Sequence, residues 1–207
     1  MLRRSLAKPT DGPVSRLLNR PVSTRLSVAL AALRPSPDLV SAVALLIGIV
    51  AAAALAGGRG IVGGLLVHVA SVVDGMDGEL ARVQLRERPL GAFLDGIADR
   101  IADAAILAGV GVWALHTSDG PLVVVLTIAA TTGSLLSMAS KDRIAALGLR
   151  LPAERGPGYA LASRDGRLLL VTIGAIAGQP LLTLIAVALV SAVALALRAL
   201  AVTRRTN

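Results

Sequence analysis

The chain has 207 residues, of which 55% are hydrophobic, and its mean hydropathy of +0.75 is too high for an ordinary soluble domain. Because apolar residues run along its whole length, we expect an all-α, polytopic integral membrane protein. The absence of cysteine excludes disulfide bridges and thiolate metal sites. A net charge of +8 with only 1% aromatic residues favours membrane lipid as a partner and no nucleic acid.

The N-terminal region is basic but has no apolar core behind its charges, so we expect no cleavable signal peptide. Residues 13–33 set Arg16, Arg20 and Arg25 against leucines, which predicts an amphipathic juxtamembrane helix that could break at Pro21. A disordered basic tail is the alternative, because the apolar face is narrow. The predicted domains are a cytoplasmic basic lead-in with the juxtamembrane helix, residues 1–34, and a six-helix membrane domain, residues 35–207.

Six apolar stretches, separated by turns rich in Pro and Gly, predict six transmembrane helices after that segment. They cover residues 38–57, 61–83, 89–115, 121–147, 160–178 and 181–201. The clean apolar run of the fifth, residues 168–178, is well short of the ~20 residues that a span needs. This stretch therefore spans only if Arg164, Asp165 and Arg167 lie at or inside the membrane interface.

The positions of lysine and arginine predict the orientation. With six spans, the outer segments hold only Arg59. The other side holds the basic residues of the N-terminus, of residues 82–88, of residues 141–167 and of the C-terminal end. We therefore expect both termini, and the functional site, on the cytoplasmic side of the plasma membrane.

Four aspartates stand out on the second and third predicted spans. Asp74 and Asp77 are three residues apart, and Asp95 and Asp99 are four apart, so each pair shares a helix face. At ~1.5 Å per residue, both pairs lie about 9–10 Å from the cytoplasmic edge of the membrane. The short connection, residues 84–88, should make the two helices antiparallel neighbours, so the pairs are predicted to meet.

Carboxylates gathered in a partly dry volume need a cation among them. Ligands that are all oxygen suit Mg²⁺ or Mn²⁺, and two such ions roughly 3.5–4 Å apart are known in phosphoryl chemistry. Gly75, Gly78 and Gly91 would let phosphates or a nucleotide approach the backbone, and Arg82 would face the same cleft. The alternative is a solvated hairpin in which these acids pair with nearby arginines.

The same stretch resembles the signature of the CDP-alcohol phosphotransferases, together with that family's layout of a juxtamembrane helix and six spans. All eight fixed positions are present: Asp74-x-x-Asp77-Gly78-x-x-Ala81-Arg82, eight residues, Gly91-x-x-x-Asp95-x-x-x-Asp99.

This resemblance implies an enzyme that transfers a phospho-alcohol group, phosphatidyl or similar, from a CDP-alcohol to a hydroxyl acceptor and releases CMP. It implies two metal ions, Mg²⁺ or Mn²⁺, on the four aspartates, with Asp99 also acting as general base, and it suggests a homodimer. The donor-binding residues that it implies are Asp38, Ser41, Gly78, Ala81, Arg82 and Gly91.

Basic residues after the fourth span and before the fifth suggest an acceptor. In family members that use phosphorylated acceptors such as inositol phosphate, cations in these places hold the acceptor phosphate. The alternative is that they anchor the helices on the positive-inside side. The residues concerned are Lys141, Arg143, Arg164 and Arg167.

The runs KPTDGPVSRLLNRPVSTRL and SRDGRLLLVTIGAIAG resemble the transferase half of enzymes similar to di-myo-inositol phosphate phosphate synthase. The donor is therefore open between CDP-diacylglycerol and a soluble CDP-polyol such as CDP-inositol. A cation transporter that uses the acids as its ion path is an alternative of another class. The outer halves of the second and third spans show no polar route for it.

Overall fold

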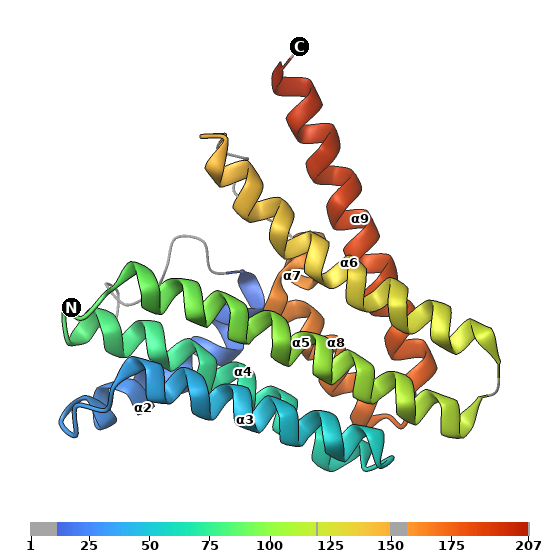
Figure 1. The fold of residues 1–207 in the computed structure, drawn as a ribbon, viewed down its shortest axis with the longest axis horizontal. Coiled ribbons are helices and arrows are strands. Elements are labelled where there is room, and N and C mark those ends of the chain that lie inside the picture. The colour runs from blue at the N-terminus through green and yellow to red at the C-terminus, as the bar shows by residue number, and fades with distance from the viewer. Residues whose placement is uncertain (1–11, 119, 150–156, 207) are drawn as a thin grey trace.

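The computed structural model describes residues 12–118, 120–149 and 157–206, and their regular structure is entirely helical (Figure 1), which confirms the all-α prediction. The first eleven residues of the predicted lead-in lie outside these ranges. The elements are η1 (Ser15–Asn19), α2 (Arg20–Ala31), α3 (Pro37–Ala56), α4 (Gly60–Val83), α5 (Pro89–Thr117), α6 (Pro121–Ala146), α7 (Pro157–Ala162), α8 (Arg164–Ile176) and α9 (Pro180–Thr206).

Proline and glycine set the ends of the long helices. A proline starts α3, α5, α6 and α9, where its missing N–H costs nothing. Ser36 caps α3 by accepting a hydrogen bond from the Leu39 N–H at 3.2 Å. Gly58 and Gly178 follow α3 and α8 with φ of 72° and 69°, which side chains disfavour. These signals explain why the predicted bounds of the first four spans agree closely with the observed ones, whereas the fifth is divided into α7 and α8 and the sixth continues to Thr206.

A helix forms where the juxtamembrane helix is predicted, so the alternative of a disordered tail is wrong for residues 15–31. A π-turn, η1, leads directly into α2, and Pro21 lies in the first turn of α2, where it breaks nothing. Ser23 and Ser27 are fully buried against α4, whereas Leu17 and Leu26 are 75% and 44% exposed. The helix therefore turns its polar face to the protein and its apolar face outward.

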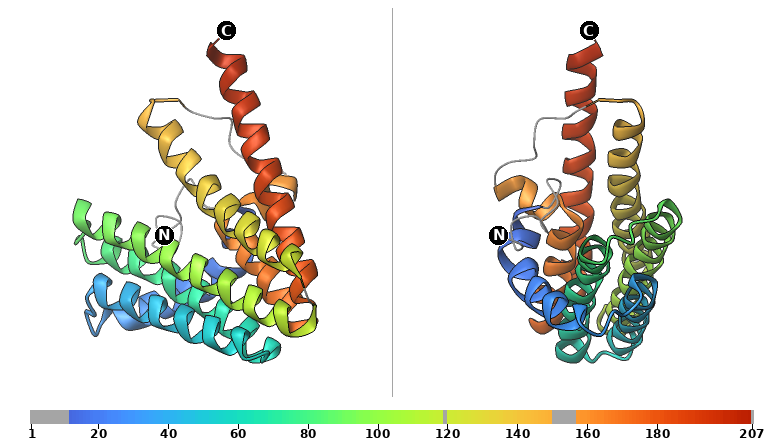
Figure 2. Two further views of the ribbon diagram at one scale, coloured as in Figure 1. Left: turned by 45° about the vertical axis from the view of Figure 1, so that its right-hand side comes forward. Right: turned by 90° about the vertical axis from the view of Figure 1, so that its left-hand side faces the viewer.

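Helices α3, α4 and α5 run side by side, α2 lies along α4, and α6 pairs with α9 (Figures 1 and 2). Helix α3 packs against both α4 and α5, which do not pack closely against each other. The predicted antiparallel neighbours are thus held apart by α3. Small residues allow the close crossings: a Cβ on Gly109 of α5 would lie 2.3 Å from the Ala52 carbonyl oxygen.

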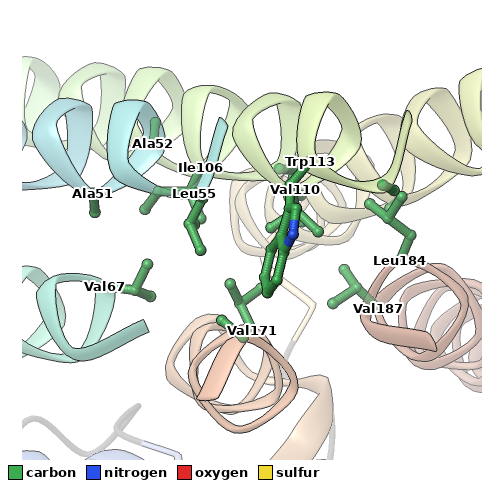
Figure 3. Packing of buried hydrophobic residues seen from close by; sticks show 14 of the residues in the cluster. Ala51, Ala52, Leu55, Val67, Ile106, Val110, Trp113, Val171, Leu184 and Val187 are labelled. Carbon is green, nitrogen blue, oxygen red and sulfur yellow. The ribbon is translucent and has the colours of Figure 1, made fainter. Parts of the chain in front are cut away.

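A buried apolar cluster joins α3, α4, α5, α6, α8 and α9 (Figure 3). Trp113 of α5 covers Gly60 at the start of α4. A Cβ on Gly60 would come within 2.4 Å of both the indole and the Ala175 carbonyl oxygen, so no other residue fits there without a shift. This packing fixes α4, α5 and α8, the three helices that carry the charged site.

Within the part of the chain that the structure describes, four helices, α3, α4, α6 and α9, are long and apolar enough to cross a membrane, not the six that the sequence predicts. Helix α5 has 29 residues, but its first half carries Asp95, Asp99, Arg100 and Asp103. Helix α8 has only 13 residues, because Ser163 separates it from α7. The polytopic prediction is therefore supported, while its count of spans exceeds what length and composition support.

Candidate metal and nucleotide site

Three of the four predicted aspartates come together. One carboxylate oxygen from each of Asp74, Asp95 and Asp99 lies within 4.8 Å of the other two. Asp74 comes from α4, and Asp95 and Asp99 come from successive turns of α5. Oxygen atoms at these separations can share one hard divalent cation. The donor set thus fits Mg²⁺ or Mn²⁺.

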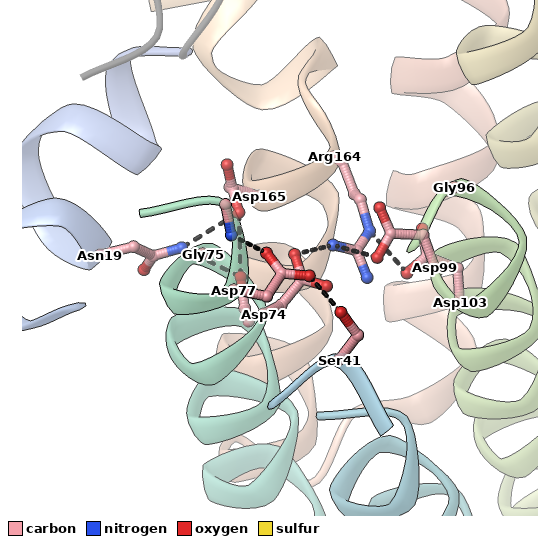
Figure 4. Close-up of polar contacts among 12 residues, drawn as sticks. Asn19, Ser41, Asp74, Gly75, Asp77, Gly96, Asp99, Asp103, Arg164 and Asp165 are labelled. Carbon is pink, nitrogen blue, oxygen red and sulfur yellow. Dashed lines mark hydrogen bonds and ion pairs between the residues drawn. The ribbon is translucent and has the colours of Figure 1, made fainter. Parts of the chain in front are cut away.

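Asp77, the fourth aspartate, lies outside this group of three. Its carboxylate accepts hydrogen bonds from the Ser41 hydroxyl of α3 and from the Gly78 N–H (Figure 4). The side chain is buried and borders the cleft that Asp95 also borders. Helix α3, by separating α4 from α5, therefore brings a hydroxyl directly to one of the predicted metal ligands.

Arg164, the first residue of α8, points into the acidic group (Figure 4). Its Nη1 lies 2.6 Å from Asp74 Oδ2 and 3.0 Å from Asp99 Oδ1, and its Nε donates to Asp103 Oδ1 at 3.1 Å. Asp103 is 3% exposed. The arginine compensates three carboxylates at once, and such charge-assisted contacts are strong in a partly buried setting.

The six predicted donor-binding residues line a single cleft of about 140 Å³. Arg86, Glu87 and Arg88 extend its outer rim, and Arg88 pairs with Asp38 there. Gly91 has room for a Cβ, whose nearest neighbour would be Asp38 Oδ1 at 3.6 Å. The protein itself does not require a glycine at this position, so the free space belongs to the cleft.

A second, cationic pocket of about 270 Å³ borders Asp99 but none of the other three aspartates. Three of the four predicted acceptor residues, Lys141, Arg164 and Arg167, border it, whereas Arg143 is exposed and lies outside its lining. Arg167 is also engaged within the protein, since it donates to Ser134 Oγ at 3.0 Å and to the Ala162 carbonyl oxygen at 2.7 Å. Arg100 and Arg198, which the sequence analysis did not select, border the pocket as well.

Glu79 was also missed by sequence reasoning. It is fully buried on α4, and Arg20 lies 2.6 Å from Glu79 Oε1. Hydroxyls of Ser23, Thr24 and Ser27 donate to the same carboxylate at 2.7–3.0 Å. The helical spacing of these hydroxyls signals a buried polar face, but no local pattern identifies its partner 52 to 56 residues away.

A smaller network ties the N-terminal segment to α8. Asn19 Nδ2 donates to Ser71 Oγ at 2.9 Å and to Asp165 Oδ1 at 3.0 Å, and Ser71 Oγ donates to Asp165 Oδ1 at 2.9 Å. Because Asp165 follows Arg164, these bonds hold the backbone from which Arg164 reaches the aspartates. The site is therefore supported by η1, α4 and α8 together.

The chain is similar to known proteins over most of its length. It is 39% identical over 175 residues to the bifunctional IPC transferase and DIPP synthase of Rubrobacter xylanophilus, which covers 84% of this chain but only 38% of that protein. It is 35% identical over 164 residues to the phosphatidylinositol phosphate synthase of Mycolicibacterium smegmatis, covering 77% of this chain and 71% of that protein.

The fold is similar to that of a solved enzyme. The apo crystal structure of the phosphatidylinositol phosphate synthase of Mycobacterium tuberculosis has a TM-score of 0.71 and 25% identity, covering 86% of this chain and 94% of that one. The same enzyme is known with CDP-DAG bound and with manganese and citrate. The family model for CDP-alcohol phosphatidyltransferases matches residues 35–203. The resemblance seen in the aspartate motif is thereby confirmed, and the chain belongs to the CDP-alcohol phosphatidyltransferase family.

Proposed function

We propose that this protein transfers a phospho-alcohol group from a CDP-alcohol to a hydroxyl acceptor, with divalent metal ions and with release of CMP. The observation that carries the proposal is the spatial arrangement of the donor cleft, the aspartate group and the cationic pocket. Asp95 borders the cleft lined by the donor residues, Asp99 borders the cationic pocket, and Asp74 joins both at the metal group between them. A donor phosphate and an acceptor hydroxyl would thus meet at the carboxylates.

Asp74, Asp77, Asp95 and Asp99 would hold two Mg²⁺ or Mn²⁺ ions. When bound, such ions neutralise the charge of a pyrophosphate and of its leaving group. Gly78, Ala81 and the other cleft residues would hold the cytidine side of the donor. Asp99 would accept the proton of the acceptor hydroxyl. The hydroxyl oxygen would bond to the β-phosphorus while the bond from that phosphorus to CMP breaks.

A phosphorylated polyol is the acceptor that we propose, because Lys141, Arg167 and Arg198 border the pocket next to Asp99. Guanidinium and ammonium groups bind phosphate well, particularly where water is partly excluded. The donor is CDP-diacylglycerol or a CDP-polyol. CDP-DAG is bound in a crystal structure of the phosphatidylinositol phosphate synthase of Mycobacterium tuberculosis, which supports the first of these donors.

For the membrane we propose six crossings, in which α5 and the α7–α8 pair complete the four apolar spans. The positive-inside distribution supports placing the termini, the lead-in of residues 1–34 and the site at the cytoplasmic face, with the transferase domain in residues 35–207. A homodimer remains a proposal. Gly111 of α5 already packs against Thr127 of α6, and Gly133 of α6 against Ser191 of α9, so a dimer would need other surfaces.

The test is CMP release by the purified protein in lipid nanodiscs. CDP-diacylglycerol and CDP-inositol are each combined with inositol and with inositol phosphate, with Mn²⁺, with Mg²⁺ and with EDTA. We expect CMP only when a metal, one of the two donors and inositol phosphate are present. Cation flux into proteoliposomes without CMP formation from any combination would overturn the proposal in favour of a transporter.

A further inference from the structure

Arg164 lies on the boundary between the acidic group and the cationic pocket. It borders that pocket together with Asp99, and it also borders a small internal cavity with Asp74 and Asp99. Its guanidinium contacts Asp74 and Asp99 through Nη1 and contacts Asp103 through Nε (Figure 4). A single side chain thus reaches from the proposed metal ligands to the proposed acceptor pocket.

Two of these three contacts engage carboxylates that a metal would need. Asp74 Oδ2 and Asp99 Oδ1, which lie 2.6 and 3.0 Å from Nη1, belong to carboxylates proposed as ligands. A guanidinium keeps its positive charge in proteins, so it cannot yield to a divalent cation by losing a proton. Because two like charges a few ångströms apart repel strongly in a partly dry site, a bound metal and this arginine position oppose each other.

The third contact, with Asp103, can hold the Nε of Arg164 in place while the end of the guanidinium moves. Asp103 is 3% exposed, is not a proposed metal ligand, and holds Nε at 3.1 Å. The backbone is fixed as well, since Ser163 Oγ accepts a hydrogen bond from the Gly166 N–H, and a Cβ on Gly166 would lie 2.1 Å from the Ala160 carbonyl oxygen. Only the end of the Arg164 side chain is therefore free to change partners.

We propose that Arg164 is the resident counter-cation of the metal carboxylates, and that metal binding turns its guanidinium about Asp103 toward the cationic pocket. There it adds a donor for an anionic acceptor, so metal and anion bind cooperatively. This inference rests on the metal site of the proposed function. Linkage requires the coupling to be reciprocal: the anion must strengthen metal binding by the same factor.

The first test measures Mn²⁺ binding to the full chain in nanodiscs by calorimetry. We expect Arg164→Gln to tighten Mn²⁺ binding at least fivefold. The matched control is Arg100→Gln, which removes an equal charge from the border of the same pocket, where Arg100 pairs with Asp142. We expect it to change the Kd less than twofold. Equal shifts in the two variants, or weaker binding in Arg164→Gln, would overturn the proposal.

The second test measures the coupling with sulfate as the anion. We expect saturating Mn²⁺ to tighten sulfate binding at least threefold in the unmodified protein and to have no effect in Arg164→Gln. Coupling that persists in the variant would mean that the anion senses the metal directly, and Arg164 would have no such role. Mn²⁺ that fails to bind even the unmodified protein would instead refute the metal site and the proposed function with it.

A third variant guards against a folding defect in Arg164→Gln. Without the carboxylate charge of Asp103, Arg164 depends more on Asp74 and Asp99, so Asp103→Asn should weaken Mn²⁺ binding at least threefold. If this acts through Arg164, the loss should vanish when the two substitutions are combined. A loss of the same size in the double variant would show a simple effect of charge and would contradict the role given to Asp103.

Discussion

At the scale of single residues, the site depends on carboxylates whose roles differ although their chemistry is the same. Asp74, Asp95 and Asp99 share one small volume, whereas Asp77 is held by Ser41 and by the Gly78 N–H. Asp99 alone among them borders the cationic pocket. A general base must lie next to the proton that it accepts, so this position supports the proposal that Asp99 is the base.

Asp95→Asn and Asp99→Asn should therefore differ. Both remove a proposed metal ligand and should weaken Mn²⁺ binding. Raising the Mn²⁺ concentration should restore most of the turnover of Asp95→Asn, while Asp99→Asn should stay about 10²–10⁴-fold slower because it also lacks the base. CMP release at saturating Mn²⁺ measures this difference. Full turnover in Asp99→Asn would refute its assignment as the base.

Gly91→Ala tests the nucleotide cleft without disturbing the fold. Its Cβ would meet only Asp38 Oδ1, at an ordinary 3.6 Å, and would otherwise project into the cleft. We expect an unchanged thermal midpoint and a KM for the CDP-alcohol raised about tenfold, equivalent to ~1.4 kcal/mol of lost binding. Gly57→Ala is the control, since its Cβ would also fit, at 3.5 Å from the Ala53 carbonyl oxygen, but at the far end of α3. A raised KM in both variants would argue against a local effect.

At the scale of elements, α2 is attached to α4 by a buried charge and not by apolar packing alone. Glu79 has no exposed surface and accepts from Arg20 and three hydroxyls. A buried carboxylate is stable only when such donors replace its water. Because Glu79 lies two residues after Asp77, α2 braces the turn of α4 that carries a predicted metal ligand.

Ser27→Ala should release part of this attachment. It removes a 2.7 Å hydrogen bond to a buried carboxylate, which is worth about 1.5–3 kcal/mol. We expect the substitution to lower the thermal midpoint. We also expect it to speed amide hydrogen exchange more in α2 than in α6. Thr203→Ala is the control, because the Thr203 hydroxyl is exposed and donates to the Ala199 carbonyl oxygen of its own helix. Comparable destabilisation by both substitutions would contradict the role given to Glu79.

The sequence predicts the helices well because their ends are marked locally, by Pro37, Pro89 and Gly178 among others. It also predicts which aspartates share a face, since helical spacing alone decides that. It does not reveal that α3 lies between α4 and α5, that Glu79 faces α2, or that Arg164 reaches Asp74. Each of these depends on contacts between segments 36 or more residues apart, for which one sequence holds no periodic signal.

At the scale of the whole molecule, exposed apolar side chains surround an interior that holds both the apolar cluster and the charged site. Leu46 of α3, Val125 of α6 and Leu189 of α9 are each about 60% exposed, as suits helices in contact with acyl chains. The charged groups of the site, among them Asp77, Asp103 and Arg167, are instead buried between the helices. Such residues are expensive in a membrane unless they are paired or lie near its surface, which constrains how the molecule sits in the bilayer.

The six-crossing arrangement can be tested without background labelling, because the chain has no cysteine. Leu85 lies just before α5, the helix whose charges exclude it from the apolar spans, and Thr117 is its last residue; both are exposed. In intact cells, a membrane-impermeant maleimide should label Thr117→Cys at once and Leu85→Cys only after permeabilisation. Labelling of both from outside, or of neither, would show that α5 does not cross. Reversed labelling would place the aspartates on the outer face and would contradict the cytoplasmic site that we propose.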